Sequence, residues 1–410
     1  MKKRILFVDD EPKILEGLQR MLRPMRDRWE MSFVASGPEA LEYLGREPFD
    51  VLVTDMRMPG MDGAQLLNIA RERYPDLVRI VLSGHSDQEL ILKSVRLAHQ
   101  YLSKPCDSET LRTSVERACG LRDWLGSDTI KQVVGKIDSL PSLPSTYTEM
   151  LDLLEDPDVT VSKVTAVVSR DVAMVAKVLQ LVNSAFFGLR QHVSNIGQAV
   201  NLLGLDTIKT LVLSLHIFSR FEESSLTVLS IDRIRRHSLK VAIFAKEIAK
   251  NEVKDQAFID DAFMAGMLHD IGKLILAANF REEYVRAREM AIADSLTIQE
   301  AERILLGAAH PEIGAYLIGL WGLPQPIVEA VAFHHDPNPC LATMLTPALA
   351  VYAANAIENS QHFSAADVTG DATITDLSVL APFQDRIPLW REICSKITEG
   401  VDDDGQGSFC

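Results

Sequence analysis

The chain has 410 residues, of which 47% are hydrophobic, and its formal net charge is −15. This length predicts two or three domains, and the sequence has no run of 18 apolar residues that would predict a transmembrane helix. The start MKKRILFVDD lacks the long apolar region of a signal peptide, and the five cysteines lack CxxC spacing. We therefore expect a cytoplasmic protein without a disulfide framework.

The negative charge is concentrated after the first 120 residues. Residues 1–120 hold 18 basic and 19 acidic residues, whereas the remainder holds 24 basic and 38 acidic residues. An acidic surface repels the phosphate backbone of nucleic acids, and the C-terminal region shows no evident helix-turn-helix pattern. These features argue against a DNA-binding transcription factor.

Residues 1–120 alternate apolar strands with amphipathic helices. The pattern predicts strands in RILFVDD, DVLVTD, VRIVLS and QYLSK, and helices in segments such as KILEGLQRML and GAQLLNIARERY. This alternation predicts a parallel α/β sheet, in which ligands bind at the carboxyl ends of the strands. The polar residues at those ends are Asp9, Asp10, Asp55, Ser83 and Lys104.

The residue types at these strand ends suit phosphoryl transfer. Clustered carboxylates repel one another unless a hard cation such as Mg²⁺ joins them, and a carboxylate beside that cation can attack a phosphoryl group. Lys104 can offset charge on the phosphoryl group, and Ser83 can donate a hydrogen bond to it. The sequence therefore predicts a phosphoryl-accepting site.

Segment 1–120 resembles the receiver domain of bacterial response regulators, which implies a doubly wound, five-stranded, flavodoxin-like fold. The resemblance implies that Asp55 is the phosphoacceptor and that a cognate histidine kinase supplies the phosphoryl group. It also implies an Mg²⁺ site made of Asp9 or Asp10, with Asp10 preferred, together with Asp55 and the backbone carbonyl of Arg57.

The same resemblance assigns roles to residues near the third and fourth predicted strands. Ser83 and Tyr101 match the positions at which receiver domains couple phosphorylation to a rearrangement of their surface. Lys104 and Pro105 match the family's Lys-Pro pair, whose peptide bond is usually cis. Proline alone makes a cis bond accessible without requiring it.

Beyond residue 120 the strand signals nearly vanish. The last receiver helix is predicted to end near Leu125, residues 121–138 form a linker, and SLPSLPS is an extended entry into a helical domain at 139–398. Apolar residues at i, i+3, i+4 and i+7 predict helices in segments such as AMVAKVLQLVNS. The acidic, Gly-rich residues 399–410 are predicted to form a disordered tail.

The segment from Leu140 to about Arg220 resembles an HDOD (HD-related output) domain. The resemblance rests on LPSLPS, DPDVTVSKV, SRDVAMVAKVLQLVNSAFFG and IGQAVNLLG. Its strongest part is Asn183-Ser184 followed by Phe186-Phe187-Gly188. It implies an output domain that acts by interaction and packing.

Several of the chain's ten histidines follow in the second half of the helical region. They are His237, His269 beside Asp270, His310, and the pair His334-His335. Neutral imidazoles suit Zn, Fe, Mn or Ni, and a mixed His/Asp set suits a hydrolytic metal centre. Lys273 lies one helical turn after Asp270 and could contact a phosphate. Packing in an apolar core is the alternative explanation for each histidine taken alone.

This arrangement resembles the HD superfamily of metal-dependent phosphohydrolases and the related HD-GYP cyclic-di-GMP phosphodiesterases. The resemblance implies that these five histidines and Asp270 bind metal. The sequence departs from the pattern in three places: HHDPNPCLATML lacks Gly-Tyr-Pro, Asn355 matches the position of a closing aspartate, and Arg233 stands where some enzymes place a ligand glutamate. These departures predict a site that is short of negative charge.

We therefore predict a two-component response regulator whose receiver controls an HDOD signalling and interaction output that is not catalytic. The alternative is a receiver-gated, metal-dependent phosphodiesterase or phosphohydrolase. The expected cofactors are Mg²⁺ in the receiver and, in the output domain, Fe, Mn or Zn. The expected partners are the histidine kinase, an unidentified downstream protein and a second copy of the chain, with neither DNA nor a membrane.

Overall fold

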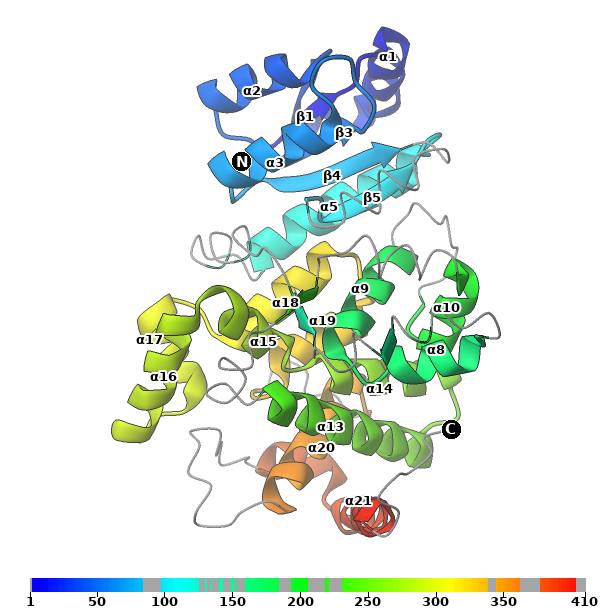
Figure 1. Ribbon diagram of the computed structural model, residues 1–410, viewed down its shortest axis with the longest axis vertical. Coiled ribbons are helices and arrows are strands. Elements are labelled where there is room, and N and C mark those ends of the chain that lie inside the picture. Colours follow the sequence, from blue (N-terminus) through cyan, green and yellow to red (C-terminus); the bar gives the residue numbers. More distant parts are fainter. Residues whose placement is uncertain are drawn as a thin grey trace.

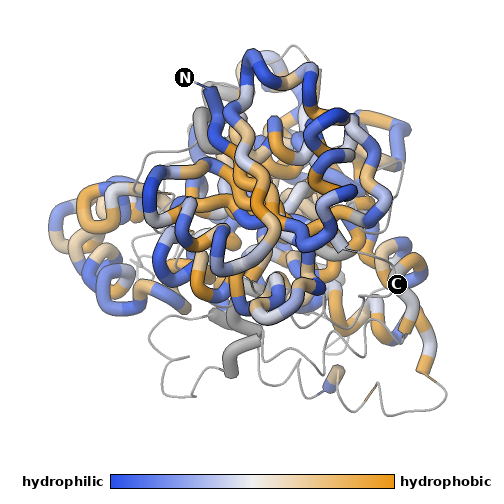
Figure 2. The backbone as a smooth tube through the Cα atoms, turned by 90° about the horizontal axis from the view of Figure 1, so that it is seen from above, coloured by the Kyte–Doolittle hydropathy of each residue, from blue (hydrophilic) through white to orange (hydrophobic). Residues whose placement is uncertain are grey.

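The computed structural model describes residues 2–83, 97–124, 130, 134, 140–142, 149–150, 153, 159–183, 193–205, 218–220, 231–337, 344–361 and 377–402. These residues form an α/β part at the N-terminus and a helical part that follows it (Figure 1). Apolar stretches gather in the interior and hydrophilic stretches lie toward the outside (Figure 2). Within the described ranges, no helix is long and apolar enough to cross a membrane.

The N-terminal part is built on one parallel sheet with the strand order β2-β1-β3-β4-β5. This is the order of flavodoxin-like folds, so the predicted fold class is confirmed. The strands are β1 (Lys3–Val8), β2 (Trp29–Val34), β3 (Val51–Asp55), β4 (Val78–Ser83) and β5 (Gln100–Ser103). The sequence pattern predicts four of them individually and misses β2. This edge strand includes the exposed Glu30 and shows no continuous apolar run.

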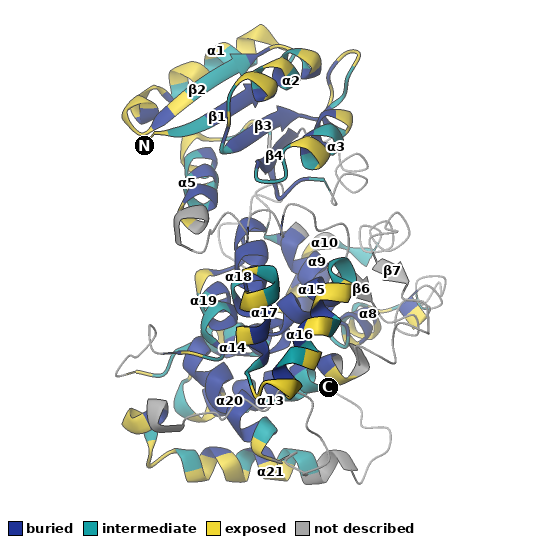
Figure 3. Ribbon diagram, turned by 90° about the vertical axis from the view of Figure 1, so that its left-hand side faces the viewer, coloured by how far each residue is buried: buried dark blue, intermediate teal, exposed yellow. Residues whose placement is uncertain are grey.

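Helices cover the faces of the sheet and leave their outer sides exposed (Figure 3). They are α1 (Pro12–Met21), the short 3-10 helix η1 (Arg23–Asp27), α2 (Gly37–Arg46), α3 (Gly63–Arg73) and α5 (Ser108–Trp124). The last of these ends within one residue of the predicted Leu125. Both faces of the central strands are therefore buried, which accounts for their nearly continuous apolar sequences.

The C-terminal part is mostly helical, as predicted. Its helices are α8 (Val161–Val168), α9 (Val172–Val182), α10 (Ile196–Leu203), α13 (Ile231–Glu252), α14 (Gln256–Leu268), α15 (Ile271–Asn279), α16 (Arg281–Ala293), α17 (Ile298–Leu306), α18 (His310–Leu320), α19 (Gln325–Phe333), α20 (Pro347–Gln361), η4 (Leu377–Phe383) and α21 (Ile387–Asp402). Helices α13, α14, α19 and α20 contact one another and form the centre of this part.

Two details differ from the sequence-based expectations for this part. Within the segment predicted to be an extended entry, β6 (Leu140–Ser142) pairs in parallel with β7 (Phe218–Arg220), so a small sheet accompanies the helices. At the other end, α21 continues through Asp402, so residues 399–402 of the predicted tail are helical. Residues 403–410 of that tail and the predicted Ser184 and 186–188 motif lie outside the described residues.

The two parts meet where α5 packs against α18 (Figure 1), and Gln100 at the start of β5 lies near Gly322, just after α18. The Nη1 atom of Arg117 on α5 donates a hydrogen bond to the backbone oxygen of Gly322, just after α18, at 3.3 Å. His99 and Arg79 are buried at the base of the sheet, where the backbone N–H of Arg79 donates to Nδ1 of His99 at 3.0 Å.

His99 is expected to make the folded protein less stable in acid. Burial lowers the pKa of His99 well below its ordinary value, and the positive charges of Arg79 and Lys177 lower it further. The unfolded chain then binds a proton that the native state excludes, so stability falls as the pH drops below about 6.5. His99→Asn, whose amide oxygen can replace Nδ1 as acceptor, should reduce this slope by up to about 1.4 kcal/mol per pH unit. Urea unfolding at pH 7.5, 6.0 and 5.5 gives the free energy of unfolding of both proteins. Equal dependence on pH in the wild type and His99→Asn would refute this role of His99.

Candidate functional site

Three carboxylates gather at the carboxyl ends of β1 and β3. Each of Asp9, Asp10 and Asp55 has an oxygen atom within 4.8 Å of the others. Lys104, directly after β5, places its Nζ atom 2.7 Å from Oδ2 of Asp9 and 3.0 Å from Oδ1 of Asp55. The peptide bond between Lys104 and Pro105 is cis. The structure therefore brings together residues from the carboxyl ends of β1, β3 and β5.

The electrostatics of this cluster favour a cation. Burial raises the pKa of Asp55, and Asp9 raises it as well, whereas Lys104 lowers it. Burial lowers the pKa of Lys104, but its hydrogen bonds to Asp9 and Asp55 raise it above the ordinary value overall. Oδ1 of Asp9 accepts the backbone N–H of Glu11 and Oδ2 accepts Lys104, so Asp10, which is only half-buried, is the more accessible carboxylate. An all-oxygen donor set of this kind fits Mg²⁺.

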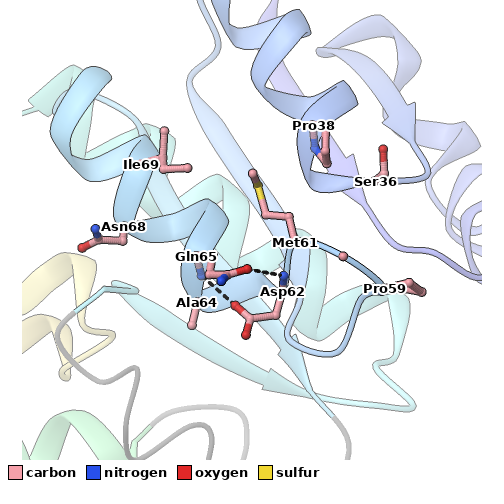
Figure 4. Close-up of a pocket in the computed structure, with 10 residues that line it drawn as sticks. Ser36, Pro38, Pro59, Met61, Asp62, Ala64, Gln65, Asn68 and Ile69 are labelled. Carbon is pink, nitrogen blue, oxygen red and sulfur yellow. Dashed lines mark hydrogen bonds between the residues drawn. The ribbon is translucent and has the colours of Figure 1, made fainter.

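The loop after Asp55 is held by the first turn of α3. Asp62 and Gln65 form a capping box in which each side chain accepts the other's backbone N–H, at 2.8 and 3.2 Å (Figure 4). This loop, the first turns of α3 and the start of α2 line a pocket. Arg57 belongs to the same loop. The expected binding of Mg²⁺ by its backbone carbonyl stays a prediction.

Gly63 allows this loop to lie against the end of β3. A Cβ atom built on Gly63 would lie 2.2 Å from the backbone oxygen of Asp55. We expect Gly63→Ala to destabilise the protein by about 1–3 kcal/mol, because the backbone contact must open. The matched control is Gly17→Ala in α1, where nothing lies within 4 Å of the added methyl group. That change should stabilise the protein by about 0.5–1 kcal/mol. Denaturant unfolding of both variants checks the opposite signs, and two similar shifts would contradict this explanation.

The two residues expected to couple phosphorylation to the surface are both fully buried. Ser83 ends β4 opposite Ser103 of β5, and Tyr101 lies on β5 opposite Val81, two residues before Ser83. Tyr101 is three residues before Lys104 and one residue after Gln100, which faces the helical part. Strand β5 therefore connects the acidic cluster with the contact between the two parts.

The helical part brings all the predicted histidines into one centre. His237 comes from α13, His269 and Asp270 from the junction of α14 and α15, His310 from the start of α18, and His334 and His335 from the end of α19. These six residues form two donor sets that share Asp270: Asp270, His310, His334 and His335 in one, and His237, His269 and Asp270 in the other. Within each set the donor atoms lie within 4.8 Å of one another.

The outer nitrogen atoms of four of these histidines face oxygen acceptors. Nδ1 of His269 lies 2.7 Å from the carbonyl oxygen of Gly266, and Nδ1 of His334 lies 2.8 Å from that of Val331. A carbonyl oxygen only accepts, so we infer that both Nδ1 atoms carry the proton. Their Nε2 lone pairs then point into the centre, which is how metal-binding histidines are oriented.

The inner nitrogen atoms of these histidines face one another in two close pairs. Nε2 of His237 lies 3.2 Å from that of His269, and Nε2 of His310 lies 3.1 Å from that of His335. Burial lowers the pKa of both His269 and His335 well below its ordinary value, so these two rings are neutral. Facing lone pairs repel one another unless a cation lies between them.

Asp270 completes the donor set as an ionised carboxylate. Burial raises its pKa, but Lys273 and the surrounding histidines lower it well below the ordinary value. Nζ of Lys273 donates to its Oδ2 atom at 3.0 Å. Oδ1 of Asp270 and Nε2 of His334 are buried 3.3 Å from each other, and with the proton of His334 on Nδ1 neither atom donates a hydrogen bond to the other. Neutral imidazoles, an ionised carboxylate and two unpartnered inward atoms fit a transition-metal centre.

Two buried glutamates behind the histidines were not predicted from the sequence. Glu302 of α17 is fully buried, and its Oε2 atom accepts both the backbone N–H and Nδ1–H of His310, at 2.8 and 2.7 Å. Glu358 of α20 places Oε2 2.8 Å from Nδ1 of His237. The only sequence signal was the position of Glu358, one helical turn after Asn355.

These glutamates change the expected charge of the centre. The prediction of a shortage of negative charge considered Asn355 and Arg233 and missed both carboxylates. Asn355 is buried on the same helix as Glu358, whereas Arg233 is exposed on α13 and belongs to neither donor set. Carboxylates that accept the outer N–H of a ligand histidine raise its basicity, so they partly compensate for the missing aspartate.

Comparison with known families agrees with both parts of the fold. A model of the response regulator receiver domain matches residues 5–116, and a model of the HDOD domain matches residues 140–337. The chain is a receiver–HDOD response regulator. The HDOD match includes all six candidate metal ligands, while Asn355 and Glu358 of α20 lie beyond it.

Several curated proteins are similar to parts of this response regulator. An uncharacterized protein of Treponema pallidum is 31% identical over 208 residues, which are 50% of this chain and 39% of that protein. The response regulator PilR of Pseudomonas aeruginosa is 32% identical over 123 residues, 30% of this chain and 27% of PilR. The DNA-binding regulator NtrC of Escherichia coli is 37% identical over 120 residues, 29% of this chain and 25% of NtrC. The chain thus spans well under half the length of these relatives.

Among solved structures, the MmoQ response regulator from Methylococcus capsulatus is similar in fold. It is 22% identical and superposes with a TM-score of 0.50, covering 62% of this chain and 98% of that one. This similarity supports the arrangement of the fold alone.

Proposed function

We propose that this response regulator acts in the cytoplasm, accepts a phosphoryl group on Asp55 from a histidine kinase, and thereby controls an HDOD output domain that holds metal ions. The observation that supports the output assignment best is the pair of donor sets joined at Asp270, with inward Nε2 atoms at 3.1–3.2 Å. Side chains that only fill a core would not be expected to place unpaired nitrogen lone pairs opposite one another, because unpaired polar atoms are costly in a buried site.

In the receiver, the proposed reaction is attack by the Asp55 carboxylate on a phosphohistidine. A new O–P bond forms as the N–P bond of the kinase breaks, and the electron pair of that bond returns to the imidazole nitrogen. Asp9, Asp10 and Asp55 would hold Mg²⁺, which neutralises phosphoryl oxygens when bound. Lys104, 3.0 Å from Asp55, is placed to donate to a phosphoryl oxygen, and Ser83 at the end of the neighbouring strand can do the same.

In the HDOD domain, the six ligands named above would hold Fe, Mn or Zn. We propose a signalling role for this domain, in which the occupied centre stabilises the conformation that an unidentified partner protein recognises. The second candidate is hydrolysis of a phosphoester, which is favoured by one carboxylate shared between two donor sets. A metal bound there would supply an activated water and polarise a phosphoryl oxygen. Lys273, beside Asp270, is the nearest candidate for contact with a phosphate.

The first test is the metal content of the full-length protein, purified without chelator or affinity nickel and measured by mass spectrometry. About two Fe, Mn or Zn ions per chain that survive dialysis would support the metal-holding output. An absence of retained metal would refute it. Loaded protein is then assayed with bis(p-nitrophenyl) phosphate and with cyclic dinucleotides. Turnover that chelation abolishes would establish the second candidate, and no turnover would exclude it for these substrates.

A further inference from the structure

Helix α18 connects the histidine centre with the receiver. Its first residue, His310, belongs to the larger donor set. Gly322, two residues beyond its last residue, accepts a hydrogen bond from Arg117 of the receiver at 3.3 Å. The 11 residues of α18 span about 16 Å at 1.5 Å per residue. One helix therefore runs from the histidine centre to the surface of the receiver.

The N-terminal end of α18 is in backbone contact with Gly272, two residues after Asp270. A Cβ atom on Gly272, two residues after Asp270, would lie 1.9 Å from the backbone oxygen of His310. A Cβ atom on Gly314 would lie 3.1 Å from the backbone nitrogen of Gly272. Because the two backbones touch, a displacement of α18 would move His310 and Asp270, which belong to the same donor set.

The C-terminal end of α18 lies against strand β5 and helix α5 of the receiver. A Cβ atom on Gly322 would lie 3.6 Å from Nη1 of Arg117 and 3.8 Å from Nε2 of Gln100. Gln100 starts β5, and Lys104 follows the end of the same short strand. Since Lys104 contacts Asp55, a change at the phosphoacceptor reaches Gly322 through a single strand.

Helix α18 is suited to move as a unit. Ten of its eleven residues are buried, so side-chain packing against α15 and α19 resists local bending. Its contact with the receiver involves charged side chains. Arg79 and Lys177 both place positive charge near His99 at this contact, and Nζ of Lys177 lies 4.3 Å from the ring centroid of Trp321, which follows α18.

We propose that α18 transmits the phosphorylation state of the receiver to the histidine centre through the contact between Arg117 and Gly322. The metal readout of this coupling rests on the function proposed above. Coupling between two binding sites is reciprocal, so metal in the HDOD domain also alters the affinity of the receiver for a phosphoryl mimic by the same factor.

The test compares the full-length protein with Arg117→Ala, which removes the side chain that bonds Gly322. Zinc affinity is measured by competition with a chromogenic chelator, with and without beryllofluoride as the phosphoryl mimic, at constant Mg²⁺. Coupled sites typically change one another's affinity at least about fivefold. We expect such a change in the wild type and less than about twofold in Arg117→Ala. The matched control is Arg112→Ala on the same helix, whose 41% exposed side chain pairs with Glu109 and which should behave as the wild type.

A second measurement does not depend on metal. Hydrogen exchange of the segment 307–323 is followed in chelator-treated protein, with and without beryllofluoride. The proposal expects a change in exchange in the wild type and in Arg112→Ala, and none in Arg117→Ala. If zinc does not bind, hydrogen exchange alone decides the coupling, and the metal content of the purified protein decides the metal-holding function. An unchanged wild-type segment, or a full response in Arg117→Ala, overturns the proposal in either case.

Discussion

Asp270→Asn is expected to remove most of the metal held by the HDOD domain. Asp270 is the residue that both donor sets share, so its replacement weakens two sites at once. Loss of a supporting residue behind a metal ligand typically costs 10–100-fold in affinity, and loss of a ligand in both sets should cost more than about 100-fold. Mass spectrometry of the purified variants and competition with a chromogenic chelator measure the effect.

Three further variants make this result interpretable. Glu358→Gln should weaken binding by the intermediate factor of about 10–100, because Glu358 supports His237 through its outer nitrogen. Asp294→Asn, on the exposed end of α16, is the matched control and should retain full binding.

Asp270→Asn also removes a partner of the buried Lys273, and breaking such a pair can cost about 3–5 kcal/mol. His335→Gln, at the less buried edge of the centre, therefore tests the larger set separately. Unchanged metal content in both variants would refute the assignment.

Asp55→Asn is expected to abolish phosphorylation of the receiver completely. The full-length protein should become labelled by a small phosphodonor such as acetyl phosphate in the presence of Mg²⁺, and chelation should prevent labelling. An asparagine amide cannot form the acyl phosphate, although it has nearly the same shape as the carboxylate. Radiolabel transfer or intact mass measures the product.

The matched control for this variant is Asp62→Asn in the same loop. Asp62 caps α3, and asparagine is an equally good N-cap, so the loop should keep its conformation and the label. Labelling that persists in Asp55→Asn would show that another residue is the phosphoacceptor. Loss of label in both variants would instead indicate that the loop, rather than the carboxylate of Asp55, had been disturbed.

The sequence was most informative where one short segment contains both an element and its chemistry. Asp55 directly follows an apolar strand, and Lys104 follows another, so the rule that parallel strands share a carboxyl edge placed them together. The adjacency of His269 and Asp270 in the sequence similarly predicted that both are metal ligands. Strand β2 escaped individual prediction because an edge strand needs no continuous apolar run.

Tertiary structure decided which residues stand behind the ligands and how the two parts are connected. Glu302 and Glu358 are ordinary helix residues in the sequence, and only the packing of α17 and α20 against the centre buries them beside His310 and His237. Arg117 and Gly322 are 205 residues apart in the chain, and neither carries a local signal of contact. Local sequence determines strands, helices and the chemical character of their ends, whereas contacts between distant segments depend on packing of the whole chain.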